Sequence, residues 1–315
     1  MWKKYLVYLA ITILLFSGCQ IEDKESLKAE IGLEKGKNRE KMNEEGVLEF
    51  YKGYSIYTDP GENEKLYDEL PEPLTDLCKL IKAQLIHPVA DLPLYRDVIA
   101  SERVNEDKEY PTVKSMLKGL NNYNQPGLIY ERKPEERLIL SCRYHAILLA
   151  SILKSRDIPV RVRYGFANYL YPGHHIYHVI CEVWNEKEQR WMLVDPDRQM
   201  VDFSREKFEY PGDVWLRYKQ GKLNSSTYGL PEWWGVHPIL SILCHDLASV
   251  LGNEHIYWDE PSLTTDSEMD EKDITPEQLD VLTRAANLLE DPDNNFEELK
   301  LLYDKYEFLQ FKKND

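Results

Sequence analysis

The sequence has few cysteines, few glycines and a deficit of positive charge. Five cysteines and 15 glycines in 315 residues exclude a disulfide-rich scaffold and a glycine-rich low-complexity chain. The 39 basic residues are outnumbered by 55 acidic ones, which gives a net charge of −16. So acidic a surface argues against a nucleic-acid partner and against direct binding to anionic lipid headgroups. At 43% hydrophobic residues, the chain can still form a large core.

Internal repeats and metal-binding motifs are also missing. No segment recurs with a period of about 20 to 50 residues, which excludes a solenoid. Three histidines, His174, His175 and His178, lie within five residues of each other. This spacing has no specific ligand geometry, and no carboxylate completes it. We therefore expect no metal and no cofactor.

The chain begins with a short apolar segment from Tyr5 to Phe16. Its length is typical of a signal peptide and is shorter than the roughly 20 residues that a membrane-spanning helix needs. Small Ser17 and Gly18 stand directly before Cys19. This segment resembles the lipobox of bacterial lipoproteins, although Phe16 stands where that motif usually has Leu, Val or Ile. The resemblance implies cleavage after residue 18, a lipid anchor on Cys19 and a location on the extracytoplasmic face of the cell membrane; an ordinary secretion signal is the alternative.

Charge and hydrophobic periodicity divide the rest of the chain. Residues 19–46 are rich in both charge signs and almost free of aromatics, which predicts a tether. Residues 47–262 read as one domain, entered through a short strand or irregular segment over 47–57. Helices are expected after Thr75, over 112–120 and over 238–252. Residues 263–315 read as an acidic hinge and a helical hairpin, whose first helix has Thr275 as N-cap and Gln278 closing a capping box.

The stretch from Ser141 to Asp197 carries the candidate chemistry. Cys142 opens an apolar helix that continues to Leu153. A thiol in the first turn of a helix lies where the macrodipole and the free backbone N–H groups favour the thiolate. The same N–H groups can stabilise an oxyanion. Cys142 is therefore a candidate nucleophile.

A predicted β-hairpin supplies the partners of this thiol. His178 begins one apolar strand and Asp195 ends the next, with the polar loop NEKEQ between them. Pairing Trp184 with Gln189 or Arg190 would set His178 opposite Asp195 or its neighbour, with Cβ atoms roughly 5 Å apart. Cys142, His178 and Asp195 are thus candidates for nucleophile, base and orienter of the base. Two alternatives remain open. His174 or His175 could be the base, and Asp197 could be the residue that orients it.

The other cysteines and one further histidine are interpreted as structural. Cys78, Cys181 and Cys244 have no disulfide-like spacing, so we expect free, buried thiols. Strand alternation predicts that Cys181 points away from the site. His87 ends the helix that follows Thr75 and is interpreted as structural.

The motifs in combination resemble the transglutaminase-like superfamily, a papain-related thiol fold. They are the cysteine at the head of a helix, the strand entry Asp157-Ile-Pro-Val-Arg161, the histidine before an acidic-aromatic strand, and the Trp191…Asp195-Pro196 ending. The resemblance implies an α+β fold in which the nucleophile helix packs on an antiparallel sheet, with a helical region after it. It also implies the roles given above to Cys142, His178 and Asp195.

Two departures from the family pattern affect the site. Arg143 stands where relatives commonly have Gly or Asp, and its charge would favour the thiolate or bind a substrate carboxylate. The upstream side chain that stabilises the oxyanion in many relatives has no obvious counterpart, since Glu136 and Arg137 are unsuitable. The backbone N–H of Cys142 would then carry more of that role.

Three hypotheses for function follow. The first is a thiol enzyme of acyl transfer that attacks an amide of a peptide or protein substrate and passes the acyl group to water or to an amine. The second is an inactive transglutaminase-like fold that serves as a surface binding or assembly module. The third is a lipoprotein whose C-terminal helices, residues 275–309, recruit a partner.

Overall fold

The computed structural model describes residues 42–123, 126–265 and 271–311. These residues belong to one compact unit that starts at Met42. The predicted signal peptide, the lipidation site Cys19 and most of the predicted tether lie outside the described residues. Within the described ranges, no helix has both the length and the apolar character needed to cross a membrane.

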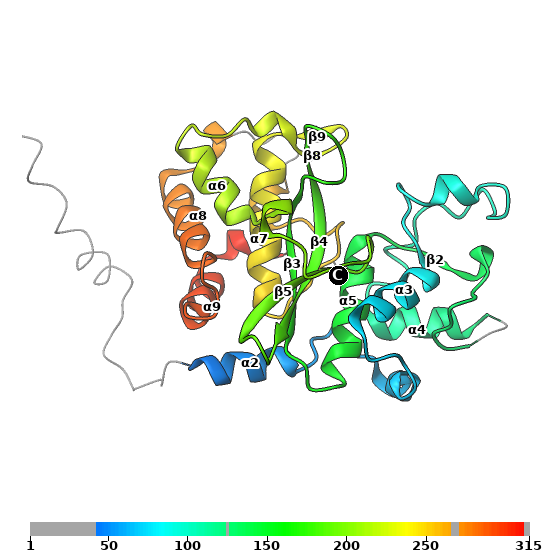
Figure 1. Ribbon diagram of the computed structural model, residues 1–315. Helices are drawn as coiled ribbons and strands as arrows, with labels where there is room; N and C mark the ends of the chain where they lie inside the picture. The colour runs from blue at the N-terminus through cyan, green and yellow to red at the C-terminus, as the bar shows by residue number, and fades with distance from the viewer. Residues whose placement is uncertain (1–41, 124–125, 266–270, 312–315) are drawn as a thin grey trace, which may run out of the picture. The chain divides into compact units, whose positions relative to one another are not determined.

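A seven-stranded sheet, counted over the described residues, lies between two groups of helices (Figure 1). Its main path runs β6-β5-β4-β3-β7 with antiparallel neighbours. β8 pairs in parallel with the start of β4, and β9 pairs with β8. The strands are β3 (Val160–Ala167), β4 (His175–Asn185), β5 (Arg190–Asp195), β6 (Met200–Val201), β7 (Phe208–Glu209), β8 (Tyr228–Leu230) and β9 (Trp233–Trp234).

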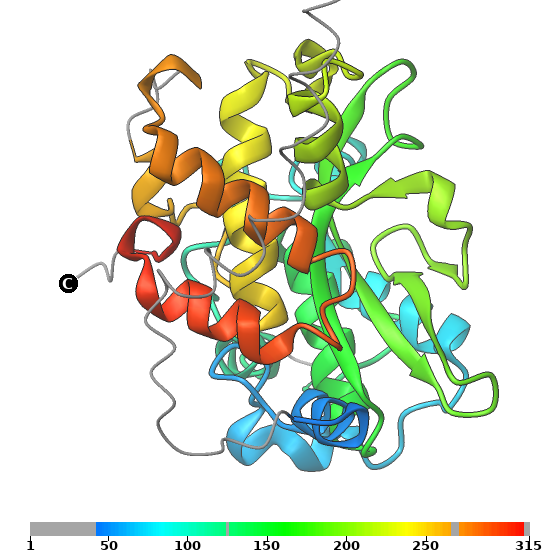
Figure 2. The same cartoon turned by 90° about the vertical axis from the view of Figure 1, so that its left-hand side faces the viewer.

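The helices fall on opposite sides of this sheet. On one side lie α3 (Leu74–Gln84), α4 (Val113–Asn121) and α5 (Cys142–Lys154); on the other lie α6 (Pro211–Lys219), α7 (Val236–Val250), α8 (Pro276–Leu288) and α9 (Phe296–Lys305). The view from the side of α8 and α9 shows these two helices in front of α7 (Figure 2). Apolar residues of α8 and α9, among them Leu282 and Leu299, belong to the same core as α5. The C-terminal helices therefore pack on the core.

Most of the expected helices are present with nearly the expected ends. α3, α4 and α7 occupy the three segments predicted as helices, although α3 ends at Gln84 and not at His87, because the chain continues into β1. Thr275 forms the predicted capping box with Gln278 at the start of α8, because each satisfies a backbone N–H of the other. The C-terminal helix ends at Lys305, and residues 307–309 form a short 3₁₀ turn.

The first part of the entry segment is helical, so the prediction of a strand or irregular entry over 47–57 is wrong for residues 47–52, whereas residues 53–57 are irregular. α2 (Glu44–Lys52) includes the last three residues of the predicted tether. The side chain of Asn43 accepts a hydrogen bond from the N–H of Gly46 and caps the helix. Val47 and Tyr51, four residues apart, bury one stripe of α2 against Phe296. The contact with Phe296 of α9 explains why α2 is helical although the sequence pattern does not predict a helix there.

Helix α5 is buried along its whole length. Every residue from Cys142 to Lys154 is buried, as expected of a helix that is apolar on most faces. Each fully buried Leu or Ile contributes about 1.5–3 kcal/mol relative to an exposed one. This packing fixes the first turn of α5, and with it the thiol, against β3 and β4.

A small parallel ladder sets the entry to α5. β1 (Leu85–Ile86) pairs with β2 (Leu138–Ile139), and the N–H of Leu140 donates to the carbonyl of Ile86 at 3.0 Å. Because the two strands run in parallel, the residues that follow them leave the ladder at the same end. His87 therefore emerges beside the segment that leads into Cys142.

Candidate active site

Cys142 is the first residue of α5 and is 8% exposed. The preceding turn is anchored by Asp107: the N–H of Ser141 donates to Oδ1 of Asp107 at 2.9 Å, and the hydroxyl of Tyr144 donates to its backbone carbonyl. The first N–H groups of a helix have no partner within the helix. The thiol thus lies at a rigid helix start beside free donors.

His178 and Asp195 form a buried pair next to this thiol. Nε2 of His178 lies 2.8 Å from Oδ2 of Asp195, and the two residues are 2% and 0% exposed. The hydroxyl of Tyr169 donates to the same Oδ2 at 2.6 Å, and the N–H of Arg198 donates to Oδ1 at 3.0 Å. Both carboxylate oxygens are therefore satisfied, and Nδ1 of His178 is left for the thiol.

The hairpin that carries this pair has a different register from the predicted one. Trp184 pairs with Trp191 and Asn185 with Arg190, so the prediction that Trp184 pairs with Gln189 or Arg190 is wrong by one or two residues. Oδ1 of Asn185 accepts hydrogen bonds from the N–H groups of Lys187 and Glu188. This Asx-type turn closes the hairpin directly after Asn185, which shifts the partner of Trp184.

The pKa values indicate an ion pair. Burial alone would raise the pKa of the Cys142 thiol, but the charge and hydrogen bond of His178, assisted by His87, lower it to about 7. Burial alone would lower the pKa of His178, but the charges of Asp195 and Cys142 raise it well above its ordinary value. For Asp195 burial is likewise outweighed by His178, and the pKa is lowered. A thiolate beside an imidazolium is the form that acts as a nucleophile.

Tyrosine rings form the rest of the surroundings. The rings of Tyr177 and Tyr257 stack at 5.1 Å, and Tyr169 meets the His178 ring edge-on at 6.1 Å. Burial, followed by neighbouring charges that include Cys142, raises the pKa of all three tyrosines. Their hydroxyls therefore stay protonated and can donate hydrogen bonds. Among the described residues, the buried hydroxyl of Tyr177 has no hydrogen-bond partner.

A second imidazole reaches the thiol. The side chain of His87 lies close enough to the thiol to assist His178 in lowering the pKa of Cys142. Its interpretation as a purely structural residue missed this contact. The signal for it lies in the tertiary structure: His87 directly follows β1, whose partner β2 leads into Cys142. In the sequence the two residues are more than fifty positions apart.

Asp197, the alternative orienter, belongs to a neighbouring network. Its Oδ1 lies 2.6 Å from Nζ of Lys82 and 3.6 Å from Nε2 of His145. The same ammonium group of Lys82 lies 2.5 Å from Asp91, which accepts a hydrogen bond from the backbone N–H of His87. Asp197 thus holds the segment around His87, whereas Asp195 holds His178.

The alternative bases are engaged elsewhere. Nδ1 of His175 lies 2.8 Å from Glu209, and the His175 ring stacks on Tyr228 at 4.2 Å. The ring of His174 packs against that of Trp234 at 4.9 Å. Of the three histidines in this segment, His178 is the one that interacts with Cys142.

Arg143 does not face a substrate. The residue is 1% exposed, and its guanidinium donates to the backbone carbonyls of Glu254 and Pro111. The prediction that Arg143 binds a substrate carboxylate is therefore wrong, because its donors are used to hold α5 in place.

The remaining described cysteines are free and buried, as predicted: Cys78, Cys181 and Cys244. The thiol of Cys181 donates to the carbonyl of Ala146 on α5 at 3.2 Å. Cys181 therefore packs onto the helix that carries Cys142, one turn beyond it.

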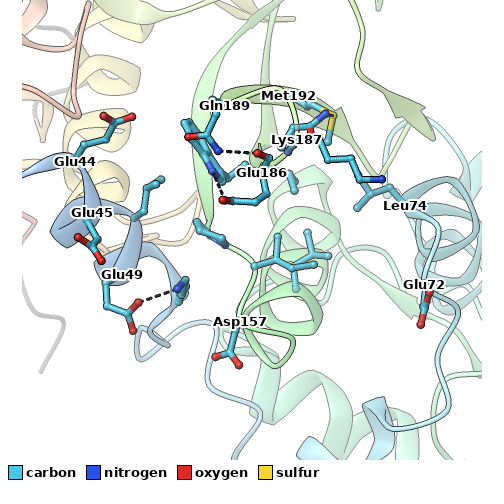
Figure 3. A pocket seen from close by; sticks show the side chains of 18 residues that line it. Glu44, Glu45, Glu49, Glu72, Leu74, Asp157, Glu186, Lys187, Gln189 and Met192 are labelled. Atoms are coloured by element: carbon cyan, nitrogen blue, oxygen red, sulfur yellow. Dashed lines mark hydrogen bonds and ion pairs between the residues drawn. The ribbon is translucent and has the colours of Figure 1, made fainter.

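A surface groove of about 990 Å³ lies apart from this centre (Figure 3). It runs between α2, with Glu44, Glu45 and Glu49, and the β4–β5 hairpin, with Glu186 and Lys187. None of its lining residues belongs to the Cys142 centre. Over the ranges that the structure describes, no group of three or more His, Cys, Asp or Glu side chains has the arrangement of a metal site.

Residues 122–196 match the family model described as the transglutaminase-like superfamily. The matched segment contains Cys142, His178 and Asp195, and the fold is a mixture of helices and an antiparallel sheet. The predicted α+β class and transglutaminase-like core are therefore confirmed. No curated protein and no solved structure matches the chain.

Proposed function

Because this chain contains a transglutaminase-like domain, we propose that it is a thiol enzyme of acyl transfer. Its reaction is attack on an amide of a peptide or protein, including an isopeptide cross-link, through Cys142, His178 and Asp195. The observation that carries the proposal is the Cys142 thiol, whose pKa is lowered to about 7 beside a histidine bonded to a buried carboxylate.

The proposed reaction has two steps. The thiolate of Cys142 attacks the amide carbonyl carbon, and the tetrahedral intermediate collapses as the His178 imidazolium protonates the leaving amine. His178, now neutral, then takes a proton from water or from an acceptor amine, which attacks the thioester and releases Cys142. Asp195 keeps the ring in the orientation that presents Nδ1 to sulfur. No cofactor takes part.

This reaction is favoured over an inactive binding module by the way the buried charges are arranged. A buried carboxylate and a buried imidazole cost free energy unless they are paired. Here the pair is supplemented by Tyr169 and Arg198 and is directed at a thiol at a helix start. A binding surface has no use for this thiol–imidazole–carboxylate arrangement.

The test uses a mixed peptide library that contains backbone amides, glutamine side-chain amides and isopeptide bonds, incubated with the full chain with and without a primary amine. Mass spectrometry reads hydrolysis and amine transfer separately. We expect product from the wild type and from Cys244→Ala, a buried thiol on α7, and none from Cys142→Ala. Turnover by Cys142→Ala would contradict the proposal.

We also propose that the enzyme is anchored by lipid at Cys19 on the extracytoplasmic face, where cell-wall peptides are accessible substrates. Support comes from the apolar segment that ends in Ser17-Gly18-Cys19. The test is fractionation of cells that express the wild type or Cys19→Ala. Retention of Cys19→Ala on membranes would refute the anchor.

A further inference from the structure

His87 is brought to the thiol by backbone pairing. β1 ends at Ile86, β2 ends at Ile139, and the parallel ladder continues with the hydrogen bond from Leu140 to Ile86. The residue that follows β1 is His87, and the segment that follows β2 reaches Cys142 after Leu140 and Ser141. This juxtaposition brings the His87 side chain close to the thiol, where it helps to lower the pKa of Cys142.

The backbone around His87 determines which ring nitrogen carries hydrogen. The N–H groups of Val89 and Ala90 both donate to Nδ1 of His87, each at 3.2 Å. A nitrogen that accepts two hydrogen bonds is unprotonated, so the proton of the neutral ring is on Nε2. His87 therefore offers the thiol an N–H donor.

The turn after His87 is closed and braced. The N–H groups of Asp91 and Leu92 donate to the carbonyl of His87, both at 3.0 Å. Oδ2 of Asp91 accepts the backbone N–H of His87 at 2.9 Å and lies 2.5 Å from Lys82, which also binds buried Asp197. The ring is thus presented by a rigid support, as a preorganised donor requires.

His178 has the complementary arrangement. Its Nε2 is bonded to Asp195, which leaves Nδ1 as the nitrogen that exchanges a proton with sulfur. His87 cannot take the thiol proton at Nε2, because that nitrogen already carries one, and its Nδ1 faces the backbone. The two imidazoles therefore have different chemical capacities at the same sulfur.

We infer that His87 is the side-chain hydrogen-bond donor of the oxyanion hole, acting through Nε2–H together with the backbone N–H of Cys142. This inference rests on the proposed acyl transfer. When the thiolate forms its S–C bond, the carbonyl π electrons move to oxygen, and His87 stabilises the resulting charge. Collapse restores the carbonyl and expels the leaving group, so His87 neither gains nor loses a proton.

The experiment compares two reactions of the same thiol in the full chain, both at pH 9, where the thiolate predominates. Iodoacetamide alkylates the thiolate by displacing iodide and forms no oxyanion. p-Nitrophenyl acetate acylates it through a tetrahedral oxyanion and releases p-nitrophenolate, which needs no proton. Modification at Cys142 is quantified by peptide mass spectrometry, and nitrophenolate release gives the acylation rate.

We expect His87→Ala to leave alkylation unchanged and to slow acylation by roughly 10²–10³-fold, the usual cost of one oxyanion donor. His87→Gln, which restores an N–H donor, should recover part of that loss. His174→Ala, a control histidine that packs against Trp234, should match the wild type in both reactions.

Different outcomes separate the two proposals. An unchanged acylation rate in His87→Ala, or equal losses of alkylation and acylation, would overturn the role of His87 while leaving Cys142 as the nucleophile. A wild-type Cys142 that is alkylated no faster than Cys244 and is not acylated would overturn the proposed function, and the role of His87 with it.

Discussion

His178 bonds to Asp195 at the point where the β4–β5 ladder stops. Pairing ends at Cys181 and Val194, and an uninterrupted register would place His178 opposite Asp197. Instead, β5 ends at Asp195, whose carboxylate lies 2.8 Å from Nε2 of His178, while Asp197 turns to Lys82 at 2.6 Å. The end of the ladder thus assigns the two aspartates to different partners.

The first prediction concerns the thiolate. Because His178 outweighs burial and lowers the pKa of Cys142 to about 7, iodoacetamide labelling of Cys142 should rise through pH 7. In His178→Ala burial, which raises the thiol pKa, is opposed by His87 alone, so labelling should shift to a higher pH than in the wild type. Peptide mass spectrometry over a pH series measures both.

Cys78 and Cys244 provide the internal control. Burial raises the pKa of each to about 12, so neither should label at neutral pH in the folded protein. If Cys142 of the wild type becomes reactive only at the same high pH as Cys78 and Cys244, the thiolate–imidazolium ion pair does not exist.

The second prediction separates the two aspartates. In Asp195→Asn the pKa of His178 should fall, because its carboxylate partner raises it, and the labelling curve of Cys142 should shift up by about one pH unit or more. Asp197→Asn, whose partners are Lys82 and His145, should leave the curve near its wild-type position. A larger shift in Asp197→Asn would reverse the assignment.

The third prediction concerns Tyr169. Its hydroxyl donates to Asp195 at 2.6 Å, and a hydrogen bond to a charged group contributes about 1.5–3 kcal/mol. Tyr169→Phe should therefore lower the free energy of unfolding by about that amount, as measured in urea. The matched control is Tyr171→Phe, since that side chain is 56% exposed. Equal stability of the two variants would show that the bond contributes nothing.

The sequence predicted the three candidate residues whose proximity depends on local pattern. Cys142 at a helix start and His178 and Asp195 in one hairpin were predicted from spacing and alternation, and the structure brings all three together. The hairpin register was wrong, because the side chain of Asn185 sets the turn. His178 and Asp195 still meet despite that error, because a contact through two side chains tolerates a shift of a residue.

Residues that depend on tertiary pairing were not predictable in this way. His87 reaches the thiol through a two-residue parallel ladder, too short to give a strand pattern in the sequence. Tyr169 lies in the loop before β4 and meets Asp195 only after the sheet has formed. Arg143 illustrates the converse error, because its neighbour in sequence is the thiol but its bonding partners are Glu254 and Pro111.

The fourth prediction concerns Lys82. Its ammonium group is the close cation of Asp197, which is 1% exposed, and it also bridges to Asp91. Its removal leaves buried Asp197 with the more distant Arg198 at 3.6 Å, so Lys82→Ala should cost about 1.5–3 kcal/mol, the contribution of a hydrogen bond to a charged group. Lys79→Ala, on the same helix, removes an exposed pair with Asp76 and should cost about 0–1 kcal/mol. Urea unfolding that gives equal losses would contradict the bracing role of Lys82.

The fifth prediction concerns the dependence of stability on pH. Burial lowers the pKa of His145 and of His245 to about 4, whereas an unfolded histidine titrates near 6.5. Because the folded pKa is depressed, their contribution is complete above about pH 6.5 and is lost as the pH falls toward 4. His178 acts in the opposite sense, since its pKa is raised and its contribution is lost as the pH rises.

A single variant isolates one of these contributions. His245 lies on α7, where Nδ1 bonds to the carbonyl of Ser241 at 2.9 Å, and it takes no part in the proposed chemistry. In His245→Gln the urea midpoint should fall less steeply between pH 6.5 and 4.5 than in the wild type, because one proton fewer is taken up on unfolding. The upper part of this range lies above the usual carboxylate pKa values of about 4, so histidine titration dominates there. Parallel curves for the two proteins would mean that His245 is charged in the folded state, which its buried position does not accommodate.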